Sequence, residues 1–385
     1  MTFRVQRRSL DDTVVLRLSG DITGAHAADL QGLLDAERDR SLVLDLAEAA
    51  VVDRAGVLLL ARSESAGATL MNCPAYVREW IERQREVFAR DQRGQEEEEH
   101  TMTQGTAKSA REGRFQSTEG LRIFFRSWLP DGRARGTVAI VPGFNAHSGY
   151  YDWVAAHLAA AGLAVFAVDL RGRGQSDGER FFVTRFSEYV DDVAGLVSQA
   201  KSQLPGLPIF LLGHSAGGVV SCLYALDNQR ELAGLICESF AFQVPAPDFA
   251  LAVFKGLSHI APHAHVLHLK NEDFSRDPEV VARMNADPLI AHETQPTRTL
   301  AEMVRADERL KQSFGQITLP VLILHGTSDK AAMPAGSQFF YETAASADKT
   351  LKLYEGYFHD LLNDIGKEAV IADITTWIGA RLPNA

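Results

Sequence analysis

The pentapeptide Gly213-His214-Ser215-Ala216-Gly217 constrains this 385-residue chain more than any other segment. An apolar run, Pro208–Leu212, precedes it and a helix-compatible stretch, Gly218–Asp227, follows it, which predicts a strand, a sharp turn and a helix. Glycines on both sides of the serine let neighbouring backbone pass closely, so the hydroxyl stands out above a sheet edge. Ser215 is therefore a candidate nucleophile, although the bare pattern also occurs in glycine-rich turns.

A serine hydroxyl is a weak nucleophile near neutral pH, so Ser215 needs a histidine to take its proton and a carboxylate to orient that histidine. Two later segments supply these groups, each a predicted strand followed by a loop. The segment Pro320–Asp329 ends on Asp329, and the segment Leu351–Asp360 presents His359. The order Ser, Asp, His is that of the α/β-hydrolase fold.

The same chemistry needs two backbone N–H groups that stabilise the oxyanion of a tetrahedral intermediate. One comes from the residue after the nucleophile, Ala216, and the other from an early loop between a strand and a helix. Thr137–Val141 is a predicted strand that opens into Pro142–Tyr151, so the N–H of Phe144 is the candidate second donor. Acyl transfer by these groups requires no metal and no cofactor, and we expect neither.

Other polar residues have competing interpretations. Glu238 ends a predicted strand where some lipases keep their acid, but we favour Asp329, whose loop lies one strand before His359. Three histidines have spacing that fits a metal site, yet no cysteine or carboxylate cluster accompanies them, and a solvated surface is the preferred interpretation. These histidines are His263, His265 and His268.

Two further pairs of residues are expected to support the site rather than to perform chemistry. Arg171 and Arg173 follow a predicted strand in a glycine-rich loop, but no phosphate-binding motif is present, so they should brace the surrounding loops. His147 and His214 are expected to be hydrogen-bonding neighbours of the site.

Six segments, in this order, resemble the monoacylglycerol lipase and lysophospholipase branch of the α/β-hydrolases, which is similar to the serine aminopeptidase S33 family. They are 146–151, Asp169–Arg180, Gly213–Gly218, Asn285–Leu289, His325–Asp329 and Tyr354–His359. The resemblance covers about residues 114–385 and has one departure, because Pro142-Gly143 stands where the family carries His-Gly.

The resemblance implies an α/β-hydrolase fold with a helical cap. It also implies hydrolysis of monoacylglycerol or a similar single-chain lipid ester through an acyl-enzyme, with Ser215, His359 and Asp329 as the catalytic groups. A short-chain carboxylesterase or a lysophospholipase is the alternative on the same machinery. The cap is expected at about 240–315, because the insertion between the predicted strands before Ser239 and after Pro320 is too long for a bare loop.

Residues 1–90 are predicted to form a separate, small α/β domain. The predicted strands and helices are Val14–Gly20, Ala25–Arg38, Ser41–Leu46, Ala55–Ser65 and Pro74–Phe88. This pattern resembles a STAS domain, the module of anti-sigma-factor antagonists, through the segments Leu18–Asp21, Leu44–Leu46 and Asp53–Gly56.

In the antagonists the residue after the aspartate of the last segment is a phosphorylatable serine or threonine, and here it is Arg54. A kinase switch is therefore not expected, and the domain should serve packing, self-association or the docking of a protein partner. A hypothesis of another class is a regulatory binding protein, led by this domain, with a vestigial hydrolase.

Composition and charge limit the remaining classes. Residues 91–113, with the run Glu96–Glu99, read as an exposed acidic linker before a hydrolase domain at 114–385. A net charge of −11 disfavours nucleic acid and anionic membranes as partners. Three cysteines fit a reducing compartment, and neither a signal peptide nor an integral membrane segment is apparent, which predicts a cytoplasmic protein.

Overall fold

The computed structural model describes residues 3–10, 13–23, 26, 30, 32–34, 41–65, 67–82, 110–242, 255–291 and 293–383. The chain divides into two compact units, Met1–Ala107 and Lys108–Ala385. The predicted linker at 91–113 lies outside the described residues up to residue 109. Its last three residues belong to strand β5 (Arg111–Gln116), so the larger unit begins earlier than residue 114.

The larger unit is built on an eight-stranded sheet with the order β14-β13-β10-β9-β7-β8-β6-β5. Neighbours from β14 to β8 are parallel, whereas β6 runs antiparallel to both β8 and β5. Besides β5, the strands are β6 (Arg122–Trp128), β7 (Gly136–Val141), β8 (Leu163–Val168), β9 (Ile209–His214), β10 (Gly234–Glu238), β13 (Val321–Gly326) and β14 (Lys349–Tyr354).

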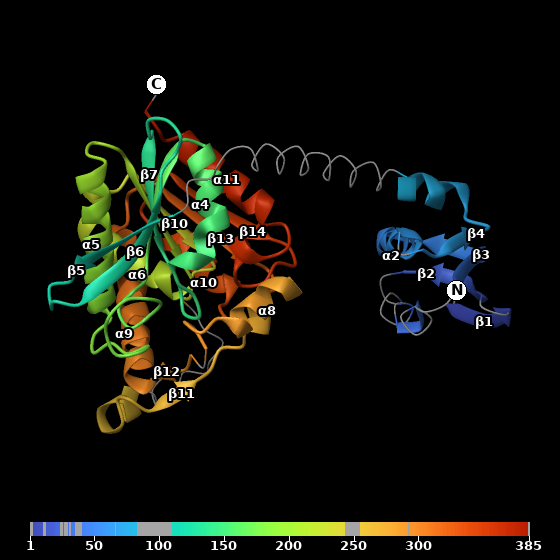
Figure 1. Ribbon diagram of the computed structural model, residues 1–385, viewed down its shortest axis with the longest axis horizontal. Helices are drawn as coiled ribbons and strands as arrows, with labels where there is room; N and C mark the ends of the chain where they lie inside the picture. The colour runs from blue at the N-terminus through green and yellow to red at the C-terminus, as the bar shows by residue number, and fades with distance from the viewer. Residues whose placement is uncertain are drawn as a thin grey trace. The chain divides into compact units, whose positions relative to one another are not determined.

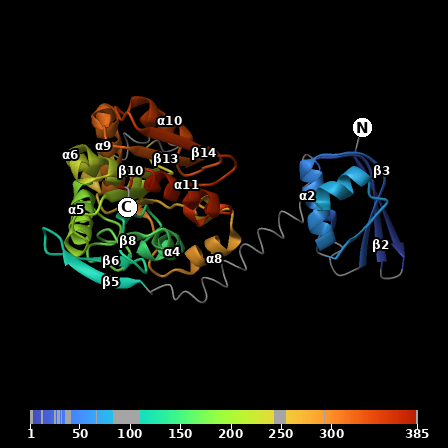
Figure 2. The ribbon, with the colours of Figure 1, turned by 90° about the horizontal axis from the view of Figure 1, so that it is seen from above.

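Helices cover both faces of this sheet, and Figures 1 and 2 show the resulting three layers. Every residue of β7, β8, β9, β10 and β13 is buried, as expected for parallel strands covered on both sides. Within β7, Ala139 and Val141 join one apolar cluster, and Val138 and Ile140 join the other. One face carries α5 (Ser187–Gln203), α6 (Ala216–Asn228), α9 (Thr297–Ser313) and α10 (Pro334–Thr343), and the other carries α4 (Asp152–Ala160) and α11 (Lys367–Gly379).

The insertion between β10 and β13 is only partly helical. It contains a helix at 255–260, strand β11 (His265–Leu267), helix α8 (Pro278–Ala286) and strand β12 (Gln295–Pro296), which pairs antiparallel with β11. Figure 1 shows β11, β12 and α8 beyond one end of the sheet, and we call residues 255–296 the cap. Helix α9, which the sequence placed in the cap, instead packs its residues Met303, Ala306 and Leu310 into the core.

The smaller unit is a four-stranded sheet with the order β1-β2-β3-β4. Strand β1 (Arg4–Leu10) is antiparallel to β2 (Thr13–Ile22), and β3 (Ser41–Val52) and β4 (Thr69–Met71) continue the sheet in parallel. The predicted strands at 14–20 and 41–46 are confirmed, whereas β1 and β4 were not predicted.

Helix α2 (Arg54–Ser65) follows β3 and confirms the helix predicted at 55–65. Residues 75–82 are also helical, as predicted from residue 74 onward, while residues 83–88 and most of the predicted helix at 25–38 lie outside the described residues. In the part of the chain that the structure describes, every helix is too short or too polar to cross a bilayer.

Candidate active site

Ser215 lies on a sharp turn between β9 and α6, as the sequence predicted. Its backbone has φ 54° and ψ −123°, a conformation that costs a serine roughly 1–3 kcal/mol. The flanking glycines make the turn possible, because a Cβ at Gly213 would lie 2.5 Å from the carbonyl oxygen of Gly217. A Cβ at Gly217 would lie 2.1 Å from the carbonyl oxygen of Val141, at the end of β7. The turn therefore forms only where two chain segments can touch backbone to backbone.

The structure brings Ser215, His359 and Asp329 together in one chain of hydrogen bonds. The His359 Nε2 atom is 2.7 Å from Ser215 Oγ, and its Nδ1 atom is 2.7 Å from Asp329 Oδ2. The loops after β9, β13 and β14 deliver the three groups, and parallel strands end at the same sheet edge. Because a carboxylate only accepts, His359 donates from Nδ1 and leaves Nε2 free to accept the serine proton.

Asp329 is held as a carboxylate by four donors. Its Oδ1 atom accepts from the N–H groups of Ala331, at 2.8 Å, and Ala332, at 2.9 Å. Its Oδ2 atom lies 3.0 Å from His325 Nε2 in addition to its bond with His359. Burial raises the pKa of Asp329, but the charge of His359 and the hydrogen bonds from both histidines outweigh it and hold the pKa well below its usual range.

His325 is a contact of Asp329 that the sequence reasoning missed. Its Nδ1 atom lies 2.7 Å from the hydroxyl of Ser337 in α10. If Nε2 donates to Asp329, Nδ1 accepts from this hydroxyl, so both ring nitrogens have a partner. The signal in the sequence was the spacing, since His325 stands four residues before Asp329 at the end of a strand.

Glu238, the rival acid, contacts a different group. Its Oε1 atom accepts the N–H of Leu361 at 2.7 Å, and burial holds its pKa well above the usual range. The backbone carbonyl of Glu238 accepts the N–H of Ser215 at 2.9 Å. Glu238 therefore supports the turn of the nucleophile, while His359 is paired with Asp329.

Among the described residues, His214, Glu238 and Asp360 could together hold a cation, because their ligand atoms lie within 4.8 Å of one another. Both oxygens of Asp360 already accept from Asn363 Nδ2, at 3.2 and 3.1 Å, and burial raises the pKa of Asp360 to about 6. Burial lowers the pKa of His214 well below its usual range. Burial thus favours the protonated form of Glu238, and a protonated carboxyl is a poor metal ligand.

The three histidines whose spacing suggested a metal site each form a hydrogen-bond contact with a different residue. His263 Nδ1 lies 2.7 Å from a carboxylate oxygen of Glu179, and His265 Nδ1 lies 2.7 Å from Thr294 Oγ1. His268 Nδ1 lies 3.0 Å from the carbonyl oxygen of Glu293.

The loop after β7 lies directly against the nucleophile. A Cβ at Gly143 would be 2.7 Å from Ser215 Cβ and 3.3 Å from its Oγ, so only a glycine lets the loop approach this closely. The next N–H belongs to Phe144, and Ala216 supplies the first N–H of helix α6. Within the described part of the chain, neither of these N–H groups donates to a protein acceptor.

The same loop is fastened to the cap through Asp287, the residue that ends helix α8. Asp287 Oδ2 lies 2.8 Å from His147 Nε2 and accepts the hydroxyl of Tyr150 at 3.0 Å. The other ring nitrogen of His147 accepts the N–H of Gly149 at 3.1 Å, which leaves Nε2 to donate to the carboxylate. His147 therefore holds the loop, as expected for a supporting residue.

Arg171 braces a second loop, the one that follows β8. Its guanidinium donates to the buried carboxylate of Asp192 at 2.8 Å, and that carboxylate also accepts the N–H of Arg171 at 2.9 Å. A further bond reaches Glu119 at 2.8 Å. These contacts tie the loop to α5 and to the β5–β6 turn.

Known proteins resemble the larger unit. Residues 132–366 match the family described as serine aminopeptidase, S33. A monoacylglycerol lipase of Mycolicibacterium smegmatis is 36% identical over 272 residues, which cover 70% of this chain and 96% of the relative. The human monoglyceride lipase is 32% identical over 274 residues, which cover 70% of this chain and 90% of the relative.

A solved structure has the same fold. The crystal structure of a monoacylglycerol lipase from Paleococcus ferrophilus matches with a TM-score of 0.62 and 28% identity, covering 67% of this chain and 99% of that one. The identities extend over most of the relatives' own length, and the matched segment contains the turn at Ser215 and the loops that carry Asp329 and His359. The chain therefore belongs to the serine aminopeptidase S33 family of α/β-hydrolases and is a carboxylic ester hydrolase.

Proposed function

We propose that this chain hydrolyses monoacylglycerols or similar single-chain lipid esters, with Ser215 as the nucleophile, His359 as the general base and acid, and Asp329 as the residue that orients the imidazole. The observation that carries this proposal is the unbroken chain of hydrogen bonds, each 2.7 Å long, from Ser215 Oγ through His359 to Asp329. A serine next to an oriented imidazole can lose its proton as it attacks, which a solitary serine cannot do near neutral pH.

The reaction has two halves with one covalent intermediate. Ser215 Oγ attacks the ester carbonyl while His359 Nε2 takes the hydroxyl proton, and the resulting tetrahedral oxyanion collapses. The C–O bond to the alcohol breaks as His359 returns the proton to the leaving oxygen. Water then attacks the acyl-enzyme with His359 as base, and the fatty acid leaves. Throughout, the Asp329 carboxylate stabilises the imidazolium, and its low pKa keeps it ionised over the working range.

The oxyanion is stabilised by the N–H groups of Phe144 and Ala216 in this proposal. Two features support the assignment: the loop at Gly143 touches Ser215, and Ala216 opens helix α6, whose N-terminus carries partial positive charge. One such donor is typically worth roughly 10²- to 10³-fold in kcat.

The substrate class rests on the relatives, which are named monoacylglycerol and monoglyceride lipases. The described cap presents apolar side chains outward, with Ile260 85% exposed and Val266 41% exposed. Phe240 and Phe242, which stand at the start of the stretch 240–315 that the sequence assigned to the cap, are instead buried in the core beside Phe314. The apolar wall that contacts an acyl chain must therefore come from other residues.

A chain-length series tests the proposal against its alternative, a short-chain carboxylesterase or lysophospholipase. Each methylene that leaves water contributes about 0.8 kcal/mol, so kcat/KM should rise roughly fourfold per methylene until the channel is full. The measurement is kcat/KM for glycerol monoesters and p-nitrophenyl esters of increasing length, with lysophospholipids alongside. A maximum at acetate with no turnover of monoacylglycerol contradicts the lipid substrate. A wild-type chain that releases no p-nitrophenol, in a burst or at steady state, supports a binding protein with a vestigial hydrolase instead.

We further propose that the smaller unit, to about residue 90, is a STAS-like domain that binds a protein partner or a second copy of this chain. The supporting features are its mixed sheet and the turn before α2, where Asp53 Oδ1 accepts the N–H of Gly56 at 2.8 Å and caps the helix. Light scattering of the full chain and of a chain beginning at Lys108 tests self-association. If each chain has the mass of its own monomer, only partner binding is left, to be tested by binding assays with candidate proteins.

A further inference from the structure

The guanidinium of Arg173 lies over the aromatic ring of Phe144, 4.1 Å from the ring centroid. Arg173 belongs to the loop after β8, and both side chains are almost completely buried. A cation at this distance from an aromatic face attracts it, and the attraction strengthens when water is excluded. Phe144 is the residue whose N–H we assign to the oxyanion, so Arg173 contacts the side chain of an oxyanion donor from behind.

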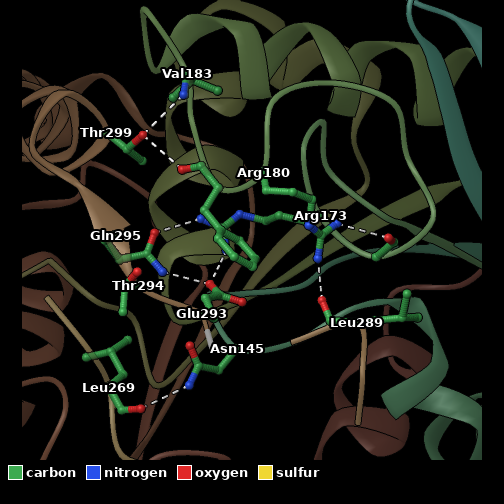
Figure 3. Close-up of polar contacts among 12 residues, drawn as sticks. Asn145, Arg173, Arg180, Val183, Leu269, Leu289, Glu293, Thr294, Gln295 and Thr299 are labelled. Carbon is green, nitrogen blue, oxygen red and sulfur yellow. Dashed lines mark hydrogen bonds and ion pairs between the residues drawn. The ribbon is translucent and has the colours of Figure 1, made fainter. Parts of the chain in front are cut away.

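The cap fixes the position of this guanidinium. One terminal nitrogen of Arg173 donates to the Glu293 carboxylate, and the other donates to Gln295 Oε1 at 2.9 Å (Figure 3). The Gln295 side chain also donates to Glu293 at 2.7 Å, which closes the set. Glu293 is 2% exposed and Gln295 is 1% exposed. The ion pair of Arg173 with Glu293 is therefore desolvated, and its geometry is well defined. From the other side, Arg173 Nε donates to the hydroxyl of Tyr189 at 3.3 Å.

The residue after Phe144 is held by the same part of the cap. Asn145 has a positive φ of 52°, and its side-chain amide donates to the carbonyl of Leu269 at 3.1 Å (Figure 3). The same amide donates to Asn271 Oδ1 at 2.9 Å. Leu269 follows β11 by two residues, and β11 places Leu267 opposite Gln295 in β12. The part of the cap around the two-stranded β11–β12 sheet therefore contacts this loop twice. It positions the Phe144 ring through Arg173, and it anchors the neighbouring backbone through Asn145.

We propose that Arg173 is a positioning residue for the oxyanion donor Phe144, and that the two-stranded β11–β12 sheet of the cap sets its position through Glu293 and Gln295. The inference rests on the proposed function, since it takes the Phe144 N–H as an oxyanion donor. Seating of the cap is then a requirement for stabilising the transition state, as well as for enclosing the substrate. Displacing the β11–β12 sheet would release Arg173 and let the Phe144 N–H move. A displacement of about 1 Å is enough to lower the reaction rate roughly 100-fold.

The test compares Arg173→Met with a matched control, Arg180→Met, in the full chain. Arg180 also ties the β8 loop to the cap, because it donates to the carbonyl oxygen of Leu289 (Figure 3) and to that of Gly174. Its guanidinium lies over the ring of Phe181, whereas that of Arg173 lies over the ring of Phe144. Each variant removes one guanidinium and one attachment to the cap; Arg173 is buried and Arg180 is exposed. They differ in whether the ring of the oxyanion donor loses its support.

The measurement is kcat for a p-nitrophenyl ester and for its thionoester, in which sulfur replaces the carbonyl oxygen. Sulfur accepts hydrogen bonds poorly, so the ratio of the two rates reports the oxyanion donors and not the general state of the fold. For Arg173→Met we expect kcat on the oxygen ester to fall roughly 10- to 100-fold, a much smaller loss on the thionoester, and little change in KM. Arg180→Met should keep the wild-type ratio.

Glu293→Gln provides a second variant of nearly the same shape, which keeps a neutral acceptor for Arg173. Glu293→Gln should also lower the rate on the oxygen ester relative to the rate on the thionoester, but by a smaller factor than Arg173→Met. It is the variant to measure if Arg173→Met fails to fold. If the folded variants lose kcat equally on both esters, or lose none, the inference is overturned. Arg173 would then only stabilise the packing of the cap against the core. A wild-type chain that hydrolyses no ester would overturn the proposed function itself, and this inference with it.

Discussion

Replacing Asp329 by asparagine tests the proposed mechanism at its most buried charge. The two oxygens of Asp329 accept four donors, and an asparagine side chain offers one acceptor and one donor in their place. If the amide oxygen keeps the two backbone N–H groups, the amide NH₂ faces His359 Nδ1. His359 must then carry its proton on Nε2, where it cannot accept the proton of Ser215.

The opposite orientation of the asparagine keeps the productive tautomer but places NH₂ against the N–H groups of Ala331 and Ala332. Losing two hydrogen bonds costs about 1 kcal/mol each, and two opposed buried donors add a desolvation penalty of roughly 1–3 kcal/mol. The imidazolium also loses its neighbouring negative charge, whose interaction is worth about 4 kcal/mol at an effective dielectric constant of 20. Either route is consistent with the loss of roughly 10⁴ in kcat that the corresponding substitution causes in a Ser-His-Asp protease.

The assay is the acylation rate with a p-nitrophenyl ester, with circular dichroism and thermal unfolding to show that Asp329→Asn is folded. Glu238→Gln is the matched control, because it replaces a buried carboxyl group close to the nucleophile that accepts from the N–H of Leu361 and is not hydrogen-bonded to His359. We expect a loss of 10³- to 10⁴-fold for Asp329→Asn and less than tenfold for Glu238→Gln. An Asp329→Asn variant that keeps a tenth of its activity, or a Glu238→Gln variant that loses as much, would refute the reasoning.

Three further predictions concern the neighbourhood of the site and the start of the larger unit. Gly143→Ala should lower kcat at least about 100-fold, because the new Cβ would lie 2.7 Å from Ser215 Cβ; labelling by a fluorophosphonate should slow equally, and unchanged labelling would contradict the expected shift. Since burial raises the pKa of Asp360 to about 6, folding holds a proton that the unfolded chain releases near pH 4, so wild-type stability should fall as pH rises from about 4 to about 6. Asp360→Asn should lessen this loss of stability by roughly 3 kcal/mol, while the raised pKa of Glu238 retains part of it; urea unfolding that shows the same loss in the variant would contradict the prediction. A chain beginning at Lys108 should keep strand β5 and hydrolyse a short soluble ester at the rate of the full-length chain. A chain beginning after Gly113 loses half of β5 and should unfold at a lower temperature. Equal unfolding temperatures of the two shortened chains would mean that β5 contributes little to stability.

The hydrogen-bonded site could be predicted from the sequence because each group stands in a short loop after a recognisable strand. The turn at Ser215 needs glycines at fixed positions, and the loops that carry Asp329 and His359 each begin directly after an apolar or alternating run. The fold then adds one simple rule, that parallel strands end at the same edge, and this rule brings the three loops together.

The groups that surround this site were less visible in the sequence. His325 lies within a strand, where the apolar run predicts core packing, and its contact with Asp329 depends on the angle at which the loop leaves the sheet. The pairing of Arg173 with Glu293 joins residues 120 positions apart and depends on where the cap folds back. No local pattern encodes such a contact.

The cap itself was predicted as helical, and strands β11 and β12 were missed. These strands contain three and two residues, which is too short for the alternation that identifies a strand. Helix α9 has an amphipathic pattern that fits either a cap or a layer helix, and only its packing against the core decides between them. The cytoplasmic location and the lack of a nucleic-acid partner stay predictions from composition.

The left-handed backbone of Ser215 has a consequence for how this protein can change over time. A glycine at this position would adopt φ 54° without strain and would remove the hydroxyl. The most stable residue for the turn is thus one that cannot perform the reaction, and selection for stability alone would drift toward an inert protein. A serine at position 215 therefore carries a cost in folding that its proposed chemistry must outweigh.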